Sequence, residues 1–465
     1  MTAPAAVDRR LPDGFTVVLD DVVVRNGGRI LIGGAPGRML RLTPAAAARL
    51  SGPDLLVRDQ GGALLARRLL DAAMAIPAPA PDSPVAGAVT VVIPVKDNQA
   101  GLTRLLSALR GLPVIVVDDG SAAPVRAPGT RVIRHARARG PAAARNAGLA
   151  AANTELVVLL DSDVVPVDGW LETLFPQFAD PALAVAAPEI VALDASAPGL
   201  LAEYERARSA LSLGRRAAPV APGGRVPYVP SAALLARRSA LLDVGGFDED
   251  LRAGEDVDLC WRLRDRGWRL RYDPAAQVAH DHRVTLREWF GRRRFYGTSA
   301  APLAARHGSR LAPLIVSPPA AATAFLLCTV RAPGVAAAAV LWSVTAIRLR
   351  RRFIGVDGAG WLAARFAARG TGAALGQLCD AALRHYWPLT AVAVVALPPV
   401  RRRVAAAAVI AGLVDWWRYR TPGGPGPLGH VVCKRLDDVA YGSGVWLGAM
   451  RGRSTSALRP ARSMR

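Results

Sequence analysis

Residues 87–300 alternate between short apolar runs and segments of helical periodicity, and no other feature of the sequence restricts the fold as much. The runs VTVVIPV (89–95), VIVVDDGS (114–121) and ELVVLLDSDVV (155–165) predict buried strands. The segments LTRLLSALRGL and GPAAARNAGLAAA between them predict helices. This order indicates an α/β fold with a mostly parallel sheet and helices on both faces, whose ligands lie at the carboxyl ends of the strands.

The last of these strands ends in Asp161-Ser162-Asp163. Two carboxylates spaced two residues apart after a buried strand can face one side of a turn, where they can bind one hard divalent cation together with a diphosphate. A solvated turn is the alternative. The acidic strand end therefore predicts a metal and diphosphate site.

Acidic residues also follow the two earlier strands. Asp97 comes after the first strand, and the second ends in Asp118-Asp119, which can accept hydrogen bonds from a base or ribose. Arg145, in the helical segment GPAAARNAGLAAA, is a candidate for the cation that keeps such acids from repelling one another, and its planar guanidinium suits a diphosphate. The alternative for Arg145 is a structural ion pair with a carboxylate.

A general base is expected in GGFDEDLRAGEDVDLCWRLRDRG (245–267). Gly254 precedes Glu255 and Asp256, and the apolar spacing places both acids in the first turn of a helix, where the dipole favours their ionised form. The alternative is an ordinary acidic helix start.

The segment AHDHR supplies His280 and His282 after a short predicted strand. The alternation predicts that the two rings point to opposite faces, so that one at most reaches a metal, and we favour His280.

The flanking regions differ from the alternating segment. Residues 1–84 predict a small domain of short strands and two helices, joined by the Pro-rich linker PAPAPDSPVAG near residues 77–86. Residues 301–450 are apolar, basic and helical, and residues 451–465 predict a basic disordered tail.

The basic charge is concentrated near the C-terminus. The chain has a net charge of +22, and residues 301–465 hold 22 basic and 5 acidic residues. Because the excess flanks apolar segments, we expect an anionic membrane and no nucleic acid as the partner. Four scattered cysteines also exclude a disulfide framework and make a zinc site improbable.

Four apolar stretches lie near residues 314–330, 333–347, 388–400 and 404–417. Each is shorter than the roughly 20 residues that a spanning helix needs. Arginine clusters flank the first pair and interrupt the second, so we expect re-entrant or interfacial helices at the cytoplasmic face of the cell membrane. A soluble Ala-rich helical domain is the alternative.

Residues 88–300 resemble the family 2 inverting glycosyltransferases of GT-A fold through VTVVIPVKDN, VIVVDDGS, GPAAARNAGL, LLDSD, FDEDLRAGEDVDLCWRLRDRG and VAHDHR, in that order. The resemblance implies a nucleotide-sugar donor and a divalent metal, Mg²⁺ or Mn²⁺. It implies Asp256 as the base, with Glu255 as the alternative. The implied metal ligands are Asp161, Asp163 and His280. The implied nucleotide-sugar contacts are Pro94, Val95, Asp97, Asp118, Asp119, Arg145, Asp161 and Ser162.

Over nearly its whole length the chain is similar to the glycosyltransferases of the mycofactocin system. That similarity implies repeated transfer of glucose from UDP-glucose to a peptide-derived redox cofactor precursor, and residues 1–84 loosely resemble peptide-binding domains of such pathways. The alternative is a rhamnosyl- or galactosyltransferase of cell-wall polysaccharide assembly. The QxxRW motif of processive synthases is absent, and RRRFYG (292–297) stands near its expected place. A catalytically dead scaffold is disfavoured because both acidic motifs are intact.

Overall fold

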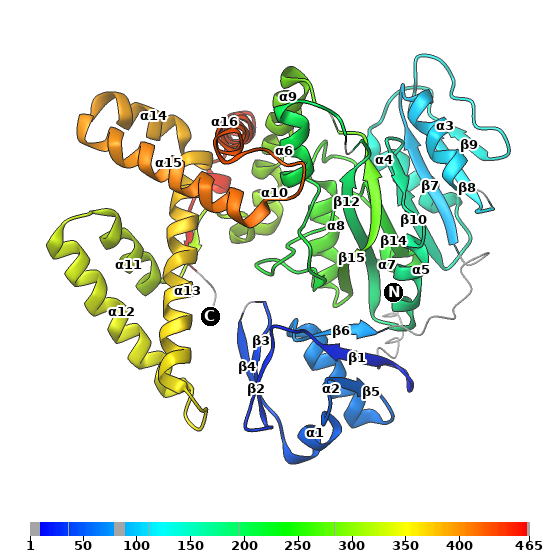
Figure 1. Cartoon of the computed structure of the whole chain (residues 1–465). Helices are drawn as coiled ribbons and strands as arrows, with labels where there is room; N and C mark the ends of the chain where they lie inside the picture. Colours follow the sequence, from blue (N-terminus) through cyan, green and yellow to red (C-terminus); the bar gives the residue numbers. More distant parts are fainter. Residues whose placement is uncertain are drawn as a thin grey trace. The chain divides into compact units, whose positions relative to one another are not determined.

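The computed structural model describes residues 10–35, 37–78, 89–109, 111–194, 196–282 and 284–462 (Figure 1). Contacts between residues divide the chain into two compact units. The first is Met1–Ala195 together with Ser209–His282, and the second is Ser196–Arg208 together with Arg283–Arg465. The predicted domain limits at residues 84 and 300 stay predictions.

In its described part, the first unit is built on a nine-stranded sheet of order β11-β15-β12-β14-β10-β7-β8-β9, and β13 pairs with β15 beside this path. The three predicted strands are confirmed as β7, β8 and β10, and all residues of β7 and β10 are buried. The strands are β7 (Val89–Val95), β8 (Val114–Asp118), β9 (Arg131–Arg134), β10 (Leu156–Leu160), β11 (Val164–Pro166), β12 (Leu183–Ala192), β13 (Ala218–Pro219), β14 (Ala233–Arg237) and β15 (Arg269–His280).

The sheet is mixed, but most of its described strands run in one direction, as predicted, because β12 and β15 pair parallel and run with β10. Strands β10, β7, β8 and β9 are parallel to one another, as predicted. Strand β14 then pairs antiparallel with β10 and with β12, and β11 and β13 pair antiparallel with β15. The strand and helix motifs between residues 89 and 165 predict the parallel strands β7, β8 and β10. The sequence of the later strands shows no such regular alternation of strand and helix.

Helices cover both faces of the sheet, as predicted. Val91 and Ile93 of β7 share a core with Leu102 of α3 (Gln99–Ala108) and Leu174 of α5 (Trp170–Leu174). Val92, which points the other way in the strand, faces α4 (Pro141–Ala151). The remaining helical segments of the unit beyond residue 89 are η1 (Phe175–Ala179), α7 (Arg238–Asp243) and α8 (Glu255–Asp265).

Residues 10–78 form short strands and two helices around an apolar core of their own, as the sequence predicts. In the described residues of this region the strand orders are β5-β1-β6 and β2-β3-β4. Thr43 caps α1, its hydroxyl accepting a hydrogen bond from the Ala46 amide at 3.2 Å. The elements are β1 (Thr16–Leu19), β2 (Val24–Asn26), β3 (Ile30–Gly33), β4 (Arg38–Arg41), α1 (Pro44–Arg49), β5 (Asp54–Leu56), α2 (Gln60–Asp71) and β6 (Ala75–Ala78). Most of the predicted linker lies outside the described residues.

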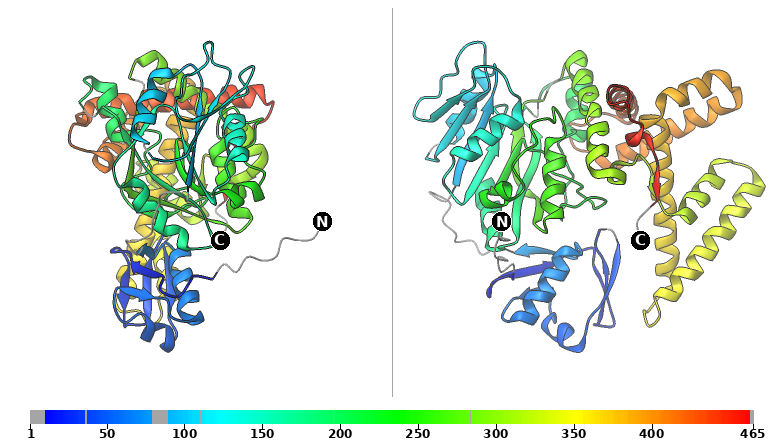
Figure 2. Two further views of the ribbon diagram at one scale, coloured as in Figure 1. Left: turned by 90° about the vertical axis from the view of Figure 1, so that its right-hand side faces the viewer. Right: turned by 180° about the vertical axis from the view of Figure 1, so that it is seen from behind.

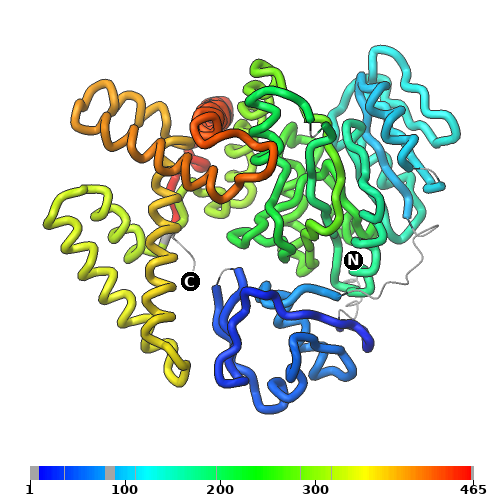
Figure 3. The backbone as a smooth tube through the Cα atoms, in the orientation of Figure 1, coloured from blue at the N-terminus to red at the C-terminus, as the bar shows by residue number. Residues whose placement is uncertain are grey.

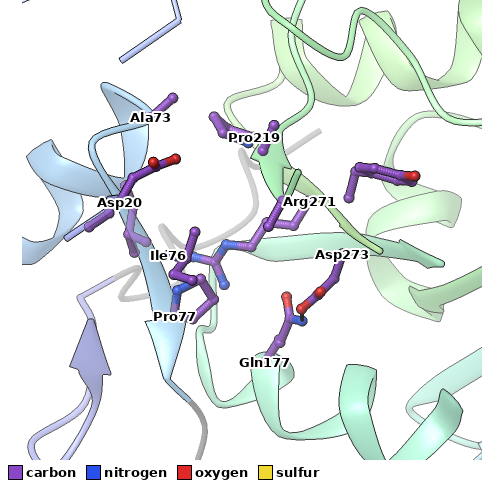
Figure 4. Close-up of a pocket in the computed structure, with 13 residues that line it drawn as sticks. Asp20, Ala73, Ile76, Pro77, Gln177, Pro219, Arg271 and Asp273 are labelled. Atoms are coloured by element: carbon purple, nitrogen blue, oxygen red, sulfur yellow. Dashed lines mark hydrogen bonds between the residues drawn. The ribbon is translucent and has the colours of Figure 1, made fainter. Parts of the chain in front are cut away.

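A buried carboxylate joins this N-terminal region to the central sheet. Asp180 accepts two hydrogen bonds from Arg67 of α2, at 2.6 and 2.7 Å, and one from Arg271 of β15 at 2.6 Å. Burial acts to raise the pKa of Asp180, but the guanidinium groups of Arg67 and Arg271 and the Ala182 amide together outweigh it and lower that pKa. Figure 4 shows Arg271 in a small pocket between Ile76 and Pro77 of β6 and the central sheet.

The second unit is mainly helical (Figures 1 and 2). Its helices are α6 (Leu200–Arg208), α9 (Leu286–Thr298), α10 (Ala300–His307), η2 (Gly308–Leu311), α11 (Pro318–Cys328), α12 (Ala332–Arg352), α13 (Ala359–Asp380), the π-helical turn η3 (Ala381–His385), α14 (Trp387–Ala396), α15 (Pro398–Tyr419), α16 (Pro427–Arg451) and η4 (Ser456–Leu458). Adjacent apolar stretches pair as the helical hairpins α11–α12 and α14–α15.

Two features of this unit differ from the sequence analysis. Helix α6 belongs to the second unit although it stands between strands of the first in the sequence; it contacts α16, and its Glu205 pairs with Arg293 of α9. Residues 451–462 are not a disordered tail: they form η4 and β17 (Ala461–Arg462), which pairs parallel with β16 (Ile315–Val316). The basic charge of this segment gave no indication of the pairing between β16 and β17.

Replacing Asp180 by Asn should destabilise the first unit strongly. The change leaves the buried guanidinium of Arg271 and the half-buried one of Arg67 without their carboxylate, a loss of about 3–5 kcal/mol for a broken buried pair. Calorimetry should show its unfolding midpoint falling by at least about 5 °C. The exposed Glu172→Gln is the control and should leave the midpoint unchanged. A shift no larger than that of the control would contradict a bridging role for Asp180.

Candidate active site

The candidate site lies where three parallel strands end. Strand β7 pairs with β10 on one side and with β8 on the other, so the residues that follow all three come together at one edge of the sheet. Asp118 is the last residue of β8, and Asp161 directly follows β10. The structure therefore brings the predicted acidic strand ends to the same edge.

The two acids after β8 are held by their own surroundings. Asp118 accepts hydrogen bonds from the Ser121 amide at 2.9 Å and from Arg134 of β9. Burial acts to raise the pKa of Asp118, but hydrogen bonds from Ser121 and its neighbours outweigh burial and lower it. Asp119 accepts from the Arg139 and Gly140 amides at 2.8 Å and contacts His135 Nδ1 at 2.7 Å. Their predicted contact with a nucleotide stays a prediction.

The loop after β7 is fixed to the segment after β10. Asp97 has a positive φ of 52°, and Ala122 N–H donates to its carboxylate at 2.8 Å. Asn98 caps α3 and donates to the hydroxyl of Ser162 at 3.1 Å. Ser162 is thereby bound to the loop predicted to contact the nucleotide. The last two residues of β7, Pro94 and Val95, are buried in the strand.

Arg145 lies at the centre of the carboxylates and is only 3% exposed. Its Nη2 donates to Asp161 Oδ1 at 2.6 Å, and its Nη1 donates to Glu255 Oε1 at 3.0 Å. Burial acts to lower the pKa of Arg145, but the charges of Asp161 and Glu255 outweigh it and raise that pKa. Arg145 thus links Asp161, which follows β10, to Glu255 of α8, and its hydrogen bonds within the described residues reach neither Asp118 nor Asp119. These ion pairs match the alternative given for Arg145, and its contact with a diphosphate stays a prediction.

Asp256 is half-buried beside this pair, at the second position of α8. Burial and the neighbouring charge of Glu255 raise its pKa to about 7. The expectation that the helix dipole favours the ionised form is therefore wrong for Asp256, because loss of solvation and like-charge repulsion are stronger. A carboxylate with a pKa near neutrality suits a general base that must take up a proton in the reaction.

The two histidines do not point to opposite faces, which corrects the sequence analysis. Strand β15 ends at His280, so the strict alternation stops there. The Nδ1 atoms of His280 and His282 approach to 3.1 Å, and one of these nitrogens must carry the proton that the other accepts. His280 Nε2 also lies 3.6 Å from Asp163 Oδ2. The favoured histidine therefore does face one of the two predicted metal-binding carboxylates.

The donor set suits a divalent metal, although it is not gathered into one cluster. Asp163 and His280 already face each other, and the side chains of Asp161 and Asp163 are about one-third exposed. Asp161 engages Arg145 instead, and in the described ranges no group of three or more His, Cys, Asp or Glu side chains is arranged to hold a metal ion. Carboxylate oxygens with one imidazole are ligands that Mg²⁺ or Mn²⁺ accepts.

Several supporting residues escaped the sequence analysis. Asn146 exchanges hydrogen bonds with the backbone of Phe247, both at 2.8 Å, and so holds the segment that leads into α8. Arg134 and His135, which hold Asp118 and Asp119, follow from the register of β8 with β9. These polar residues are visible in the strings RNAG and RVIRH, but the sequence does not show their hydrogen-bond partners, which depend on tertiary contacts.

The rate of any reaction that uses Asp256 as a base should fall as the pH drops below about 7, because the protonated carboxyl no longer accepts a proton. Asp256→Asn should lower the turnover rate by at least ~10²-fold. Turnover measured from about pH 5 to pH 8 checks both expectations. A flat profile in the wild type, or a larger loss in Glu255→Gln than in Asp256→Asn, would contradict the assignment.

Comparison with known sequences gives two matches of different extent. Residues 90–242 match the family described as Glycosyl transferase family 2. The chain is similar to pre-mycofactocin glycosyltransferases from two Mycobacterium tuberculosis strains, CDC 1551 / Oshkosh and H37Rv. Each is 49% identical over 464 residues, which cover 97% of this chain and 98% of the relative.

Other likenesses are partial. A poly-beta-1,6-N-acetyl-D-glucosamine synthase of Staphylococcus aureus strain COL is 31% identical over 140 residues, 30% of this chain and 33% of that protein. Among solved structures, the mannosyltransferase PcManGT from Pyrobaculum calidifontis in complex with GDP-Man and Mn²⁺ matches with a TM-score of 0.37 at 19% identity, covering 73% of this chain and 89% of that one.

Proposed function

Because the chain belongs to the pre-mycofactocin glycosyltransferases within glycosyl transferase family 2, we propose that it moves glucose from UDP-glucose to a peptide-derived redox cofactor precursor, with inversion at the anomeric carbon. The observation that carries the chemistry is the position of Asp256, a carboxyl whose pKa is raised to about 7, beside Glu255, which Arg145 links to Asp161. This arrangement supports a proton acceptor that works next to a leaving-group site at Asp161.

The transfer needs one displacement step. The acceptor hydroxyl gives its proton to the Asp256 carboxylate while its oxygen forms a bond to the anomeric carbon. The bond between that carbon and the diphosphate oxygen breaks, and the electron pair leaves with UDP. Glu255, held by Arg145 at 3.0 Å, keeps a negative charge next to Asp256 and so favours uptake of the proton.

Asp161, Asp163 and His280 would hold the divalent ion, Mg²⁺ or Mn²⁺. When bound, the ion neutralises charge that develops on the departing diphosphate. The chain's own residues orient this edge of the site. Ser162 is bound to Asn98 after β7, and the Asp281 amide donates to the Asp163 carbonyl at 2.9 Å.

Acceptor recognition is assigned to residues 10–78 in this proposal. The region has its own apolar core, and ion pairs through Asp180 join it to the central sheet in addition to the linker. Repeated glucose transfer would proceed by release and rebinding, because RRRFYG lies in α9, with Arg293 buried against Glu205 and Asp437 in place of a QxxRW motif.

We also place the enzyme at the cytoplasmic face of the cell membrane. Among the described residues, Ala332–Arg352 is the one helix that is long and apolar enough to cross a bilayer, which by itself is weak support. The proposal depends more on the basic charge of residues 301–465 than on this helix.

Purified full-length protein should add whole hexose units from UDP-glucose to the peptide-derived precursor, detected by mass spectrometry. EDTA should abolish transfer, and Mg²⁺ or Mn²⁺ should restore it.

Asp161→Asn should lose transfer without unfolding, because the carboxylate acts on the leaving group, whereas the exposed Asp168→Asn in the same segment should behave as wild type. Transfer of rhamnose or galactose to a lipid-linked acceptor instead would establish the cell-wall alternative.

A further inference from the structure

Two helical hairpins stand out from the second unit. Each joins a short arm to a long one: α11 to α12, and α14 to α15. Figures 1 and 3 show the α11–α12 hairpin and the connected ends of α14 and α15 on the same side of α13, whereas the C-terminal part of α15 crosses to the other side. The hairpins therefore present their outer surfaces together, within a single unit of the chain.

The outer surfaces of both hairpins are apolar and poorly covered. Val330, between α11 and α12, is 74% exposed, and Val395, near the end of α14, is 75% exposed. Only 6% of the apolar window of α12 is buried inside the structure. Other large apolar side chains exposed on these hairpins are Phe325, Val335, Val340, Val344, Ile347, Leu389, Val392, Leu397, Val409, Ile410, Leu413, Val414 and Trp417. Exposed apolar surface of this extent marks an interaction site.

The charges on the hairpins are almost all positive. No Asp or Glu lies on α11, α12 or α14, and the single acid of α15, Asp415, is paired with His430 at 2.8 Å. The arginines stand at the ends of the apolar stretches, at positions 331, 348, 350–352, 401–403 and 418. This arrangement complements an anionic lipid surface and repels a second copy of the same surface.

The helix lengths determine how deep the hairpins can reach. At 1.5 Å per residue, α11 and α14 are about 16 and 15 Å long, half of the roughly 30 Å hydrocarbon core. If α14 entered end-on, the arginines 401–403 just beyond its tip would reach the bilayer centre, where a charged side chain is costly. Arg401 instead donates to the carbonyl oxygens of Val394 and Val395, at 2.8 and 3.0 Å.

We propose that both hairpins lie within the headgroup and upper acyl region of one anionic leaflet, with their arginines at headgroup level, and that neither hairpin crosses the bilayer. This inference rests on the proposed membrane location and specifies how it is achieved. Helix α12 is long enough to span, but its return arm α11 is not, and the arginines 331, 348 and 350–352 bracket its apolar stretch. Interfacial helices of this kind bury their apolar side by about 5–10 Å.

Vesicle flotation tests the surface. Full-length protein should float with phosphatidylglycerol-containing vesicles and far less with phosphatidylcholine alone. Val330→Glu with Val395→Glu should weaken binding at least about tenfold. Replacing arginines 401–403 by Gln should weaken it by roughly 100-fold at low salt, at about 1 kcal/mol per arginine. The control is Leu64→Glu, which alters a side chain 65% exposed in the first unit and should leave flotation unchanged.

Depth measurements test the mode of insertion. A fluorophore on the exposed Cys328, or on Val395→Cys in a Cys328→Ser background, should be quenched more by lipids brominated near the headgroup than by lipids brominated at the chain end. Stronger quenching by the deep lipid, or labelling of either position from outside intact spheroplasts, would overturn the one-leaflet arrangement while leaving the membrane location intact. Failure of the wild type to float on anionic vesicles would overturn the location itself.

Discussion

The buried guanidinium of Arg145 is the interaction on which the geometry of the site depends. Four carboxylates, those of Asp161, Asp163, Glu255 and Asp256, lie along a strand end and a helix start, and Arg145 donates to two of them. One cation does not balance four acids, so the site retains negative charge that a divalent ion and a proton on Asp256 would reduce. Burial, together with the neighbouring charge of Glu255, raises the pKa of Asp256.

Close packing of α4 against the sheet delivers Arg145 to this position. A Cβ atom at Gly148 would lie 2.2 Å from Val92 Cγ1 of β7, so only glycine lets the helix approach so closely. One residue after Arg145, Asn146 binds the backbone of Phe247 and aligns the segment that enters α8. In the string ARNAG, Arg145 thus supplies positive charge to the site, Asn146 holds the segment before α8, and Gly148 lets α4 contact β7.

The sequence was sufficient where local patterns decide the structure. The strands β7, β8 and β10, their shared edge and the helices on both sheet faces follow from apolar runs and helical periodicity. The sequence was not sufficient where contacts between residues far apart in the chain decide the structure. The contact between His280 and His282 requires knowing where β15 ends, and the place of α6 in the second unit involves its contacts with α16 and the pairing of Glu205 with Arg293. The pKa of Asp256 depends on burial, which no local pattern of residues reports.

The central claim is that a single displacement, with Asp256 as proton acceptor, transfers the sugar with inversion. Nuclear magnetic resonance of the anomeric proton in freshly formed product tests this most directly, because UDP-glucose carries its sugar in the α configuration. The account predicts that the first detectable product of the wild type is the β-glucoside, and that Asp256→Asn makes the same product more slowly. An α-glucoside as the initial product would contradict the account.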